Sequence, residues 1–466
     1  MGFLQIFRQI TVEPVLFAFM LCTFLKMPVS QQLIFRKTCI SLYNESFCEH
    51  NFTSRSCGES LSDEEIAVQK SSSQWIFYNT LAYELPSIVT SLLLGSWSDK
   101  FGRKFAILLP LVGLGLEAIS GLVNAHFFSA SPVYLLFGNI LSGMFGGFST
   151  ILMALFSYIA DITKDKRERT LRIGLLESMT FFGGATGELI SGVLIEKLGF
   201  IAPYIVILSL VVITTIYVVL VLKESYFPNQ QSRFFSTESF LGSLKVWVKN
   251  RPGKRRLQLI LLLLIGFFAP FIVLTGTNDV IILFLLRRPF CFSSPMIGYF
   301  LAVSLGVRCF GVLFGMPILI RMFKLSDTTI VCAGIITNIA STVFIAFTTK
   351  TWQAFLAISS GIFNGVIIPT VRAMMSKLVD SDEQGSLFAV IASASAISTL
   401  IASLIFNNIY KLTVSTLPGL CFLLMAGLLI FPLFLMIYLR ISDKSPSLVL
   451  EVNNDDALID SEESTT

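Results

Sequence analysis

Charged residues and histidine are both scarce in this chain. Asp, Glu, Lys and Arg make up only 14% of its 466 residues, against roughly 25% in soluble globular proteins. Apolar residues make up 54%, and the mean hydropathy is +0.76. Because a water-exposed surface needs more charge than this, a soluble globule is excluded, and the chain is predicted to be integral to a membrane. A net charge of +4 is too small for a nucleic-acid-binding surface.

Residues that build catalytic and metal sites are equally few. The only two histidines, His50 and His126, lie in or near polar connections, and the eight cysteines form no CxxC pair. A histidine metal site or a Ser/His catalytic pair therefore has almost nothing to be built from. We expect no metal, no cofactor and no enzymatic activity.

Long apolar runs predict twelve membrane-spanning helices. The runs cover residues 14–36, 74–96, 105–127, 132–160, 171–194 and 200–222, and then 256–286, 296–320, 327–348, 352–375, 385–409 and 414–440. The first run exceeds the length of a signal peptide and lacks its cleavage site, so we read it as a retained helix. The predicted class is an all-α membrane protein with two six-helix halves.

The connections between these runs predict the domain organisation and the orientation. A basic stretch, 223–255, joins an N-terminal half, 1–222, to a C-terminal half, 256–440, and an acidic tail, 441–466, follows. Most Lys and Arg residues fall in the head, the tail and the loops on one side of the membrane, which predicts that both termini are cytosolic. The opposite loop 37–73 carries two glycosylation sequons, and we expect it to be lumenal or extracellular. The sequons are those of Asn44 and Asn51.

The connection between the second and third runs contains the pattern Gly-x-x-x-Asp-Lys-x-Gly-Arg-Lys. Gly95 would let a neighbouring helix approach closely, and Gly102 would permit a turn that other residues resist. Asp99 could pair with Arg103 or lie at a helix N-terminus, where a carboxylate is favoured. Alone, the pattern could also be an ordinary basic loop with a turn glycine.

In this position the pattern resembles the signature loop of the major facilitator superfamily. The stretch 158–169, in which Asp161 precedes several basic residues, resembles the loop between that superfamily's fourth and fifth helices. Residues 376–385 resemble a diverged second copy. The resemblance implies the major facilitator fold and a gating role for Gly95, Asp99, Gly102, Arg103 and Asp161. We expect charge reversal at Asp99 to reduce turnover more than substrate binding.

Narrower features resemble solute carrier family 46 over essentially the whole chain. They are Val-Glu-Pro at 12–14, Arg-Ile-Gly-Leu-Leu-Glu at 172–177, Pro-Phe-Cys at 289–291, and the stretches 371–379 and 383–388. The family includes proton-coupled carriers of folates and of steroid conjugates and bile acids. Residues 44–51 and the tail are most similar to those of its lysosomal member.

The resemblance implies a proton-coupled symporter that moves amphipathic organic anions, such as steroid conjugates or bile acids, from the lysosomal lumen to the cytosol. A plasma-membrane folate carrier is one alternative, and a non-transporting receptor or scaffold with the same fold is another. Residues 454–459 resemble an acidic dileucine signal, which would bind sorting adaptors. Such a tail could equally be solvated and disordered. Besides lipid, the expected partners are a small organic anion and protons.

Ionisable residues inside the predicted spans are costly and usually line a pathway or pair with one another. They are Lys26, Glu84, Glu117, Glu177, Glu188, Asp279, Arg308 and Arg372. Glu177 and Glu188 lie 11 residues apart, on nearly the same helix face and about 16 Å from each other along the axis. Such a pair could carry protons through the bundle, or each member could make a structural contact.

The resemblance adds roles for some of these residues. It ties Glu177 to proton coupling and Arg372 to the substrate and proton pathway. Where the folate carriers have a histidine in the seventh helix, this chain has Leu274, so the coupling site must rely on carboxylates, with Asp279 five residues further on. Arg372, Lys26 and Arg308 would suit an organic anion if they face a cavity, whereas internal pairing would make them structural.

Cysteines on the lumenal side predict a disulfide bond. Cys291 follows the seventh span on that side, and the first loop carries Cys39, Cys48 and Cys57. An oxidising compartment should link Cys291 to one of these three. By resemblance to a bridge in the family, the partner is Cys48 or Cys57.

Overall fold

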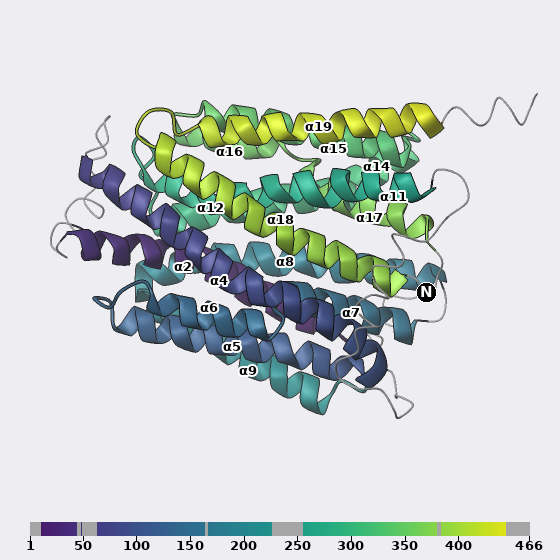
Figure 1. The fold of residues 1–466 in the computed structure, drawn as a ribbon, viewed down its shortest axis with the longest axis horizontal. Helices are drawn as coiled ribbons and strands as arrows, with labels where there is room; N and C mark the ends of the chain where they lie inside the picture. The colour runs from purple at the N-terminus through teal and green to yellow at the C-terminus, as the bar shows by residue number, and fades with distance from the viewer. Residues whose placement is uncertain are drawn as a thin grey trace, which may run out of the picture.

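The computed structural model describes residues 11–43, 48, 63–163, 166–225, 255–379 and 384–443. Within these ranges the regular structure is helical throughout and contains no strand, which confirms the all-α prediction. The helices run roughly parallel along one long axis (Figure 1). The bundle therefore has two ends, which we name after one residue at each. The Gly102 end carries the 102 turn and the 163–166 connection, and the Cys39 end carries the 43–63 and 287–293 connections.

The N-terminal half occupies the lower part of Figure 1. Its helices are α2 (Glu13–Leu42), α4 (Asp63–Phe101), α5 (Arg103–His126), α6 (Tyr134–Met144), α7 (Gly147–Ile162), α8 (Lys166–Leu198) and α9 (Ile201–Leu220). The predicted fourth span is thus two helices, α6 and α7. The chain turns from one to the other at Gly146 and at Gly147, the first residue of α7, whose φ angles of 95° and 55° lie in the region that favours glycine.

The C-terminal half contains several interrupted spans. Its elements are α11 (Arg255–Leu263), η1 (Leu264–Phe268), α12 (Ala269–Leu286), α13 (Ser294–Phe310), η2 (Gly311–Gly315), α14 (Met316–Arg321), α15 (Asp327–Ala346), α16 (Thr351–Ser360), η3 (Asn364–Val366), α17 (Ile367–Lys377), α18 (Gln384–Thr413) and α19 (Leu420–Asp443). Single π-helical turns, η1 and η2, interrupt the seventh and eighth spans. The tenth span breaks between α16 and α17, which leaves irregular backbone in the middle of the bundle.

Eleven of the described helical spans are long and apolar enough to cross a membrane. The second predicted span is not among them, although α4, a helix of 39 residues, stands in its place. Polar residues along α4, among them Glu84, explain why composition alone does not identify it. Helix α4 runs diagonally across the bundle in front of the other N-terminal helices (Figure 1).

The first connection at the Cys39 end is shorter than the predicted loop 37–73. Helix α2 continues to Leu42 and α4 begins at Asp63, so both helices extend by more than a turn into the stretch that we had assigned to the loop. Acidic residues at 63–65 explain the early start of α4, because carboxylates stabilise the first turn of a helix. Most of the predicted linker 223–255 lies outside the described residues.

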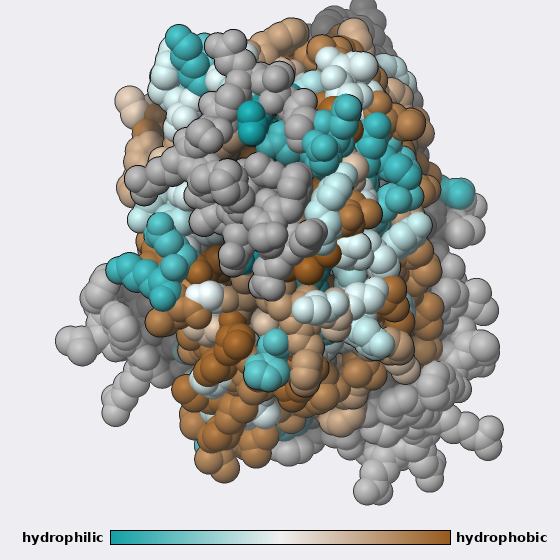
Figure 2. Space-filling view, turned by 90° about the vertical axis from the view of Figure 1, so that its left-hand side faces the viewer, coloured by the Kyte–Doolittle hydropathy of each residue, from teal (hydrophilic) through white to brown (hydrophobic). Residues whose placement is uncertain are grey.

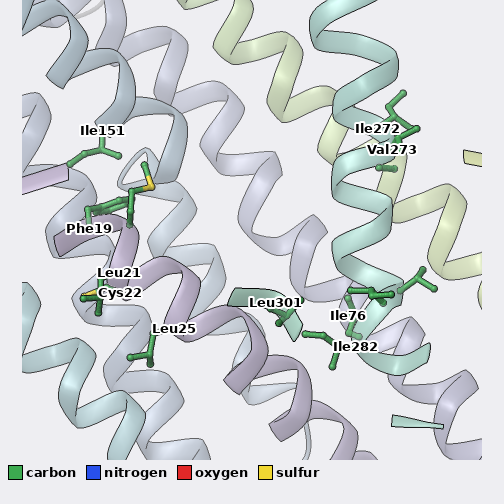
Figure 3. Close-up of a cluster of buried hydrophobic side chains, with 14 of the residues drawn as sticks. Phe19, Leu21, Cys22, Leu25, Ile76, Ile151, Ile272, Val273, Ile282 and Leu301 are labelled. Carbon is green, nitrogen blue, oxygen red and sulfur yellow. The ribbon is translucent and has the colours of Figure 1, made fainter. Parts of the chain in front are cut away.

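Two pairs of helices make the most extensive contacts between the halves, α8 with α13 and α4 with α18. At the first crossing the backbones touch through glycine. A Cβ atom on Gly298 would lie 2.7 Å from the carbonyl oxygen of Glu188, and one on Gly192 would collide with the carbonyl of Ser294. Buried apolar side chains from both halves form one hydrophobic cluster, which includes Phe19 and Leu25 on α2 and Leu301 on α13 (Figure 3).

The flanks of the bundle carry large apolar side chains that face outward. On α9, Ile213 and Leu220 are 62% and 76% exposed, and on α19, Phe434 is 66% exposed. Hydrophobic residues dominate the lower part of the view onto the left-hand end of the bundle, whereas hydrophilic ones gather above (Figure 2). This distribution suits a protein whose flanks contact lipid.

Candidate functional site: buried charges between the two halves

The turn after α4 is built around Gly102. Its φ of 108° favours glycine, and the Glu224 carboxyl carbon lies 2.7 Å from where a Cβ atom would stand. Glu224 accepts hydrogen bonds from the backbone N–H groups of Arg103 (2.7 Å) and Lys104 (3.2 Å). A carboxylate thus binds the N-terminus of α5, where the helix dipole favours it. No local pattern singled out Glu224, which lies more than 100 residues further along the chain.

Arg103 and Asp161, both predicted gating residues, are in contact at the Gly102 end. The guanidinium Nε of Arg103 donates to Asp161 at 3.0 Å, and its Nη1 donates to the Ser98 hydroxyl at 2.8 Å. Ser225 also donates to Asp161, at 3.2 Å. The contact connects the start of α5 to the end of α7 within the N-terminal half. The side chain of Asp99 and the surroundings of Gly95 lie outside what the structure describes.

Lys26 on α2 is paired inside the N-terminal half. Its ammonium lies 2.6 Å from Glu117 of α5 and 5.4 Å from the centre of the Tyr83 ring. This internal ion pair fits the alternative in which Lys26 has a structural role. Half-buried Glu84 on α4 interacts electrostatically with this lysine and, across the halves, with Asp279.

Asp279 belongs to a polar cluster between the halves. It is 6% exposed and accepts a 2.8 Å hydrogen bond from the amide of Asn407 on α18. The backbone and side-chain oxygens of Asn407 accept from Ser73 of α4, at 2.8 and 3.1 Å. Helices α4, α12 and α18 are thereby joined through one asparagine. Neither Ser73 nor Asn407 stood out in the sequence.

Four other hydrogen bonds between described residues connect the halves. Gln31 donates to the backbone of Asn278, Ser294 to Gln32, Arg288 to Glu65 and Tyr410 to Gln69. These bonds, like that of Ser73, lie in the half of the bundle nearer the Cys39 end. Within the described part of the chain, these hydrogen bonds hold the two halves together near the Cys39 end.

Glu188 on α8 and Arg308 on α13 face each other across the halves. Glu188 is 4% exposed, and its Oε2 has no hydrogen-bond partner in the described part of the chain. It interacts electrostatically with Arg308, yet no direct ion pair joins these two described residues. A buried carboxylate with an unsatisfied oxygen is costly, and so is a guanidinium that makes no ion pair with a described residue. Such costly ionisable groups inside a membrane are typical of functional positions.

Arg308 also lines a pocket between α12, α13, α15 and the break before η3. Five side chains in its wall make no hydrogen bond to another described residue: Asn278, Ser304, Arg308, Asn338 and Asn364. The remaining wall is largely apolar and includes Leu274, Phe300 and Ile345. Amide and guanidinium donors beside an apolar surface suit a ligand that has an anionic group on a hydrophobic body.

Arg372 on α17 lies between aromatic rings from the two halves. Its guanidinium carbon is 5.7 Å from the ring centre of Phe156 on α7 and the same distance from that of Phe267 in η1. Arginine is attracted to the faces of such rings. Arg372 thus contacts both halves, but it is absent from the wall of the Arg308 pocket.

Cys48 is bonded to Cys39, so the predicted alternative that joins Cys48 to Cys291 is wrong. These two cysteines are only nine residues apart in sequence, so a disulfide that closes a short loop can form between them instead. Cys291 is itself disulfide-bonded, as expected, to a partner outside the described residues. Cys57, Asn44, Asn51 and the side chain of Glu177 also lie outside them.

A helical bundle in two halves, with lipid-facing flanks and buried charges at the junction of the halves, defines a membrane transporter. The Major Facilitator Superfamily profile matches residues 60–403. The chain belongs to the major facilitator superfamily and is a transporter, not an enzyme.

Curated relatives match over nearly their full length. The proton-coupled folate transporter of Bos taurus is 30% identical, covering 91% of each chain. The lysosomal proton-coupled steroid conjugate and bile acid symporter SLC46A3 of Gallus gallus is 31% identical, covering 93% of this chain and 94% of the relative. Among solved structures, the human organic anion transporter MFSD10 superposes with a TM-score of 0.67 at 14% identity, covering 91% and 97%. That last likeness concerns the fold alone.

Proposed function

We propose that this protein is a proton-coupled symporter of amphipathic organic anions. The observation that carries the proposal is Arg308, an intramembrane guanidinium without an ion-pair partner in the described chain, in a pocket with both amide and apolar walls. The fixed positive charge favours an anion, and the apolar wall favours a hydrophobic body. Relatives named as proton-coupled carriers support the same class.

The apolar part of this pocket wall favours steroid conjugates and bile acids over folates, although the pocket, at about 50 Å³, would have to widen to admit either. A steroid body presents a rigid hydrocarbon face, which matches Leu274, Phe300 and Ile345, whereas a folate is polar along most of its length. By resemblance to the folate carriers, Leu274 also occupies the position where those carriers have a histidine. A folate carrier of the plasma membrane is the second candidate, supported by the 30% identity to the bovine folate transporter.

The proposed direction is from an acidic lumen to the cytosol, with both termini and the Gly102 end cytosolic. The proposed location is the lysosomal membrane, and the proposed signal for sorting adaptors is the tail segment 454–459. A difference of about 2 pH units supplies about 2.7 kcal/mol per proton. Such a gradient supports roughly hundredfold accumulation. The proposed proton route runs along α8 through Glu188 and Glu177, while Arg372 contributes positive charge near the Gly102 end.

Uptake into vesicles that contain the purified protein tests the proposal. Labelled estrone sulfate and labelled folate are offered side by side, with and without an imposed pH gradient. We expect estrone sulfate to accumulate only with the gradient and folate to accumulate far less. Preferred folate uptake would establish the second candidate. Binding without uptake of either would establish a receptor or scaffold.

A further inference from the structure

Helices α8 and α13 bring Glu188 and Arg308 together from opposite halves. The close approaches of Gly192 to Ser294 and of Gly298 to Glu188 show that the two helices cross antiparallel. Long side chains on a helix lean toward its N-terminus. Glu188 therefore extends toward the level of Arg308, and Arg308 extends back toward Glu188. This geometry explains their electrostatic interaction without a direct ion pair.

Other charged groups near Glu188 are already engaged or do not face it. Of the titratable groups on the elements packed against α8, Arg308 alone interacts electrostatically with Glu188. Lys26 is held by Glu117, and Asp161 by Arg103 at the far end. The titratable groups on those elements include Cys22 and Lys26 on α2, Tyr299, Arg308 and Cys309 on α13, Tyr158 and Asp161 on α7, and Tyr204 and Tyr217 on α9.

We propose that the Glu188 carboxylate and the anionic group of the substrate compete for the Arg308 guanidinium, and that this competition couples the proton to the substrate. In the empty carrier, ionised Glu188 balances the charge of Arg308. When the substrate binds, its anion takes over Arg308 together with amide groups of Asn278, Asn338 and Asn364. Glu188 then takes up one proton and becomes neutral. This inference rests on the proposed function and assigns its coupling residue.

Charge balance makes the two binding events depend on each other. Ionised Glu188 with Arg308 has no net charge, and neither has protonated Glu188 with Arg308 and a bound monovalent anion. The two mixed states, with a proton but no anion or with an anion but no proton, each leave one uncompensated charge inside the membrane. Such a charge is costly there. Proton and anion should therefore bind together, one of each, and each should raise the affinity for the other.

The test measures binding of estrone sulfate to the purified protein in lipid nanodiscs between pH 5 and pH 8. The wild type should lose affinity as the pH rises, approaching about tenfold per unit for one linked proton. Glu188→Gln should bind with an affinity that no longer depends on pH, because its side chain is always neutral. It should also keep counterflow at equal pH while losing gradient-driven accumulation. Glu196→Gln, on the same helix but exposed, should behave as the wild type.

Arg308→Gln gives a second, independent measurement if Glu188→Gln does not fold. Its affinity for estrone sulfate should fall at least tenfold, and the remaining affinity should not vary with pH. The inference is overturned if Glu188→Gln, or Arg308→Gln in its place, keeps the wild-type dependence of affinity on pH. Glu177→Gln is then the next variant to examine. If the wild type itself neither binds nor transports estrone sulfate at any pH, the proposed function fails, which is a distinguishable result.

Discussion

Asn407 holds the buried carboxylate of Asp279, to which its amide Nδ2 donates at 2.8 Å. The same side chain also accepts from Ser73 of the other half. One amide therefore satisfies a buried carboxylate and connects α4 to α18. Removing it would leave polar atoms unsatisfied in both halves.

Asn407→Ala should lower the free energy of unfolding by about 1–3 kcal/mol, because a buried acceptor loses its donor. Thermal unfolding in detergent measures the effect. The neighbouring Asn408, which is exposed and bonds only within its own helix, provides the control. Equal losses of stability in Asn407→Ala and Asn408→Ala would contradict a structural role of the Asp279 cluster.

The ion pair of Arg103 with Asp161 should affect turnover more than stability. The side chains are 11% and 26% exposed, and such partly exposed pairs contribute about 0–1 kcal/mol. We expect Asp161→Asn to lower the rate of uptake severalfold at unchanged substrate affinity. Both quantities are measured in vesicles, and the exchange Arg103→Asp with Asp161→Arg should restore part of the rate. A large fall in affinity would argue against a gating role.

Lys26 and Glu117 form a buried pair whose members should be needed together. Lys26→Met alone leaves a buried carboxylate without its cation, a change that costs about 3–5 kcal/mol. The double variant Lys26→Met with Glu117→Gln removes both charges and should recover most of the stability. Estrone sulfate affinity in the double variant decides the role of Lys26. Wild-type affinity would show that Lys26 is structural, and a lost affinity would show that it binds substrate.

Gly102→Ala should disturb the turn for two reasons. The backbone of Gly102, with φ 108° and ψ 155°, lies in a region that is almost restricted to glycine and costs other residues about 1–3 kcal/mol. The new methyl group would also displace the Glu224 carboxylate. Gly199→Ala is the control for a positive φ without a side-chain collision, since its φ is 73° and nothing lies within 4 Å of its Cβ position. Thermal unfolding should show a larger loss for Gly102→Ala. Equal losses would mean that Glu224 contributes little.

Peptide mapping without reduction should find Cys291 joined to Cys57, because Cys39 and Cys48 are bonded to each other. Glycans on Asn44 and Asn51 in mammalian cells would place the same connection on the lumenal side. Loss of both glycans, or a Cys291 peptide joined to another cysteine, would contradict the proposed topology.

The sequence was sufficient for the helical spans and for the charged residues inside them. Apolar runs are local features, so they can be read without knowing which helices are neighbours. Pairing is different, because Lys26 meets Glu117 only after α2 and α5 pack together. The sequence identifies both residues as charges inside spans, but it does not show that they are in contact. It likewise does not show that Arg308 lies opposite Glu188.

Residues without an unusual local pattern were missed altogether. Glu224 looked like one acid in a polar stretch, and Asn407 looked like a tolerated amide near the end of an apolar run. The polar lining of the Arg308 pocket was missed for the same reason, since Asn338 and Asn364 come from separate helical segments. The signal that could have identified these residues was an amide side chain inside a predicted span, because a polar group there needs a hydrogen-bond partner.

The glycine contact between α8 and α13 has a mechanical consequence. Because backbone lies directly against backbone at Gly298, the two helices are close together at the crossing, which can act as a pivot. Helix α8 has 33 residues and is about 50 Å long, so a rotation of roughly 10° about the crossing would displace its more distant end by several ångströms. The bundle could then open at one end while it closes at the other. Larger side chains at the crossing would obstruct this lever motion without touching the substrate.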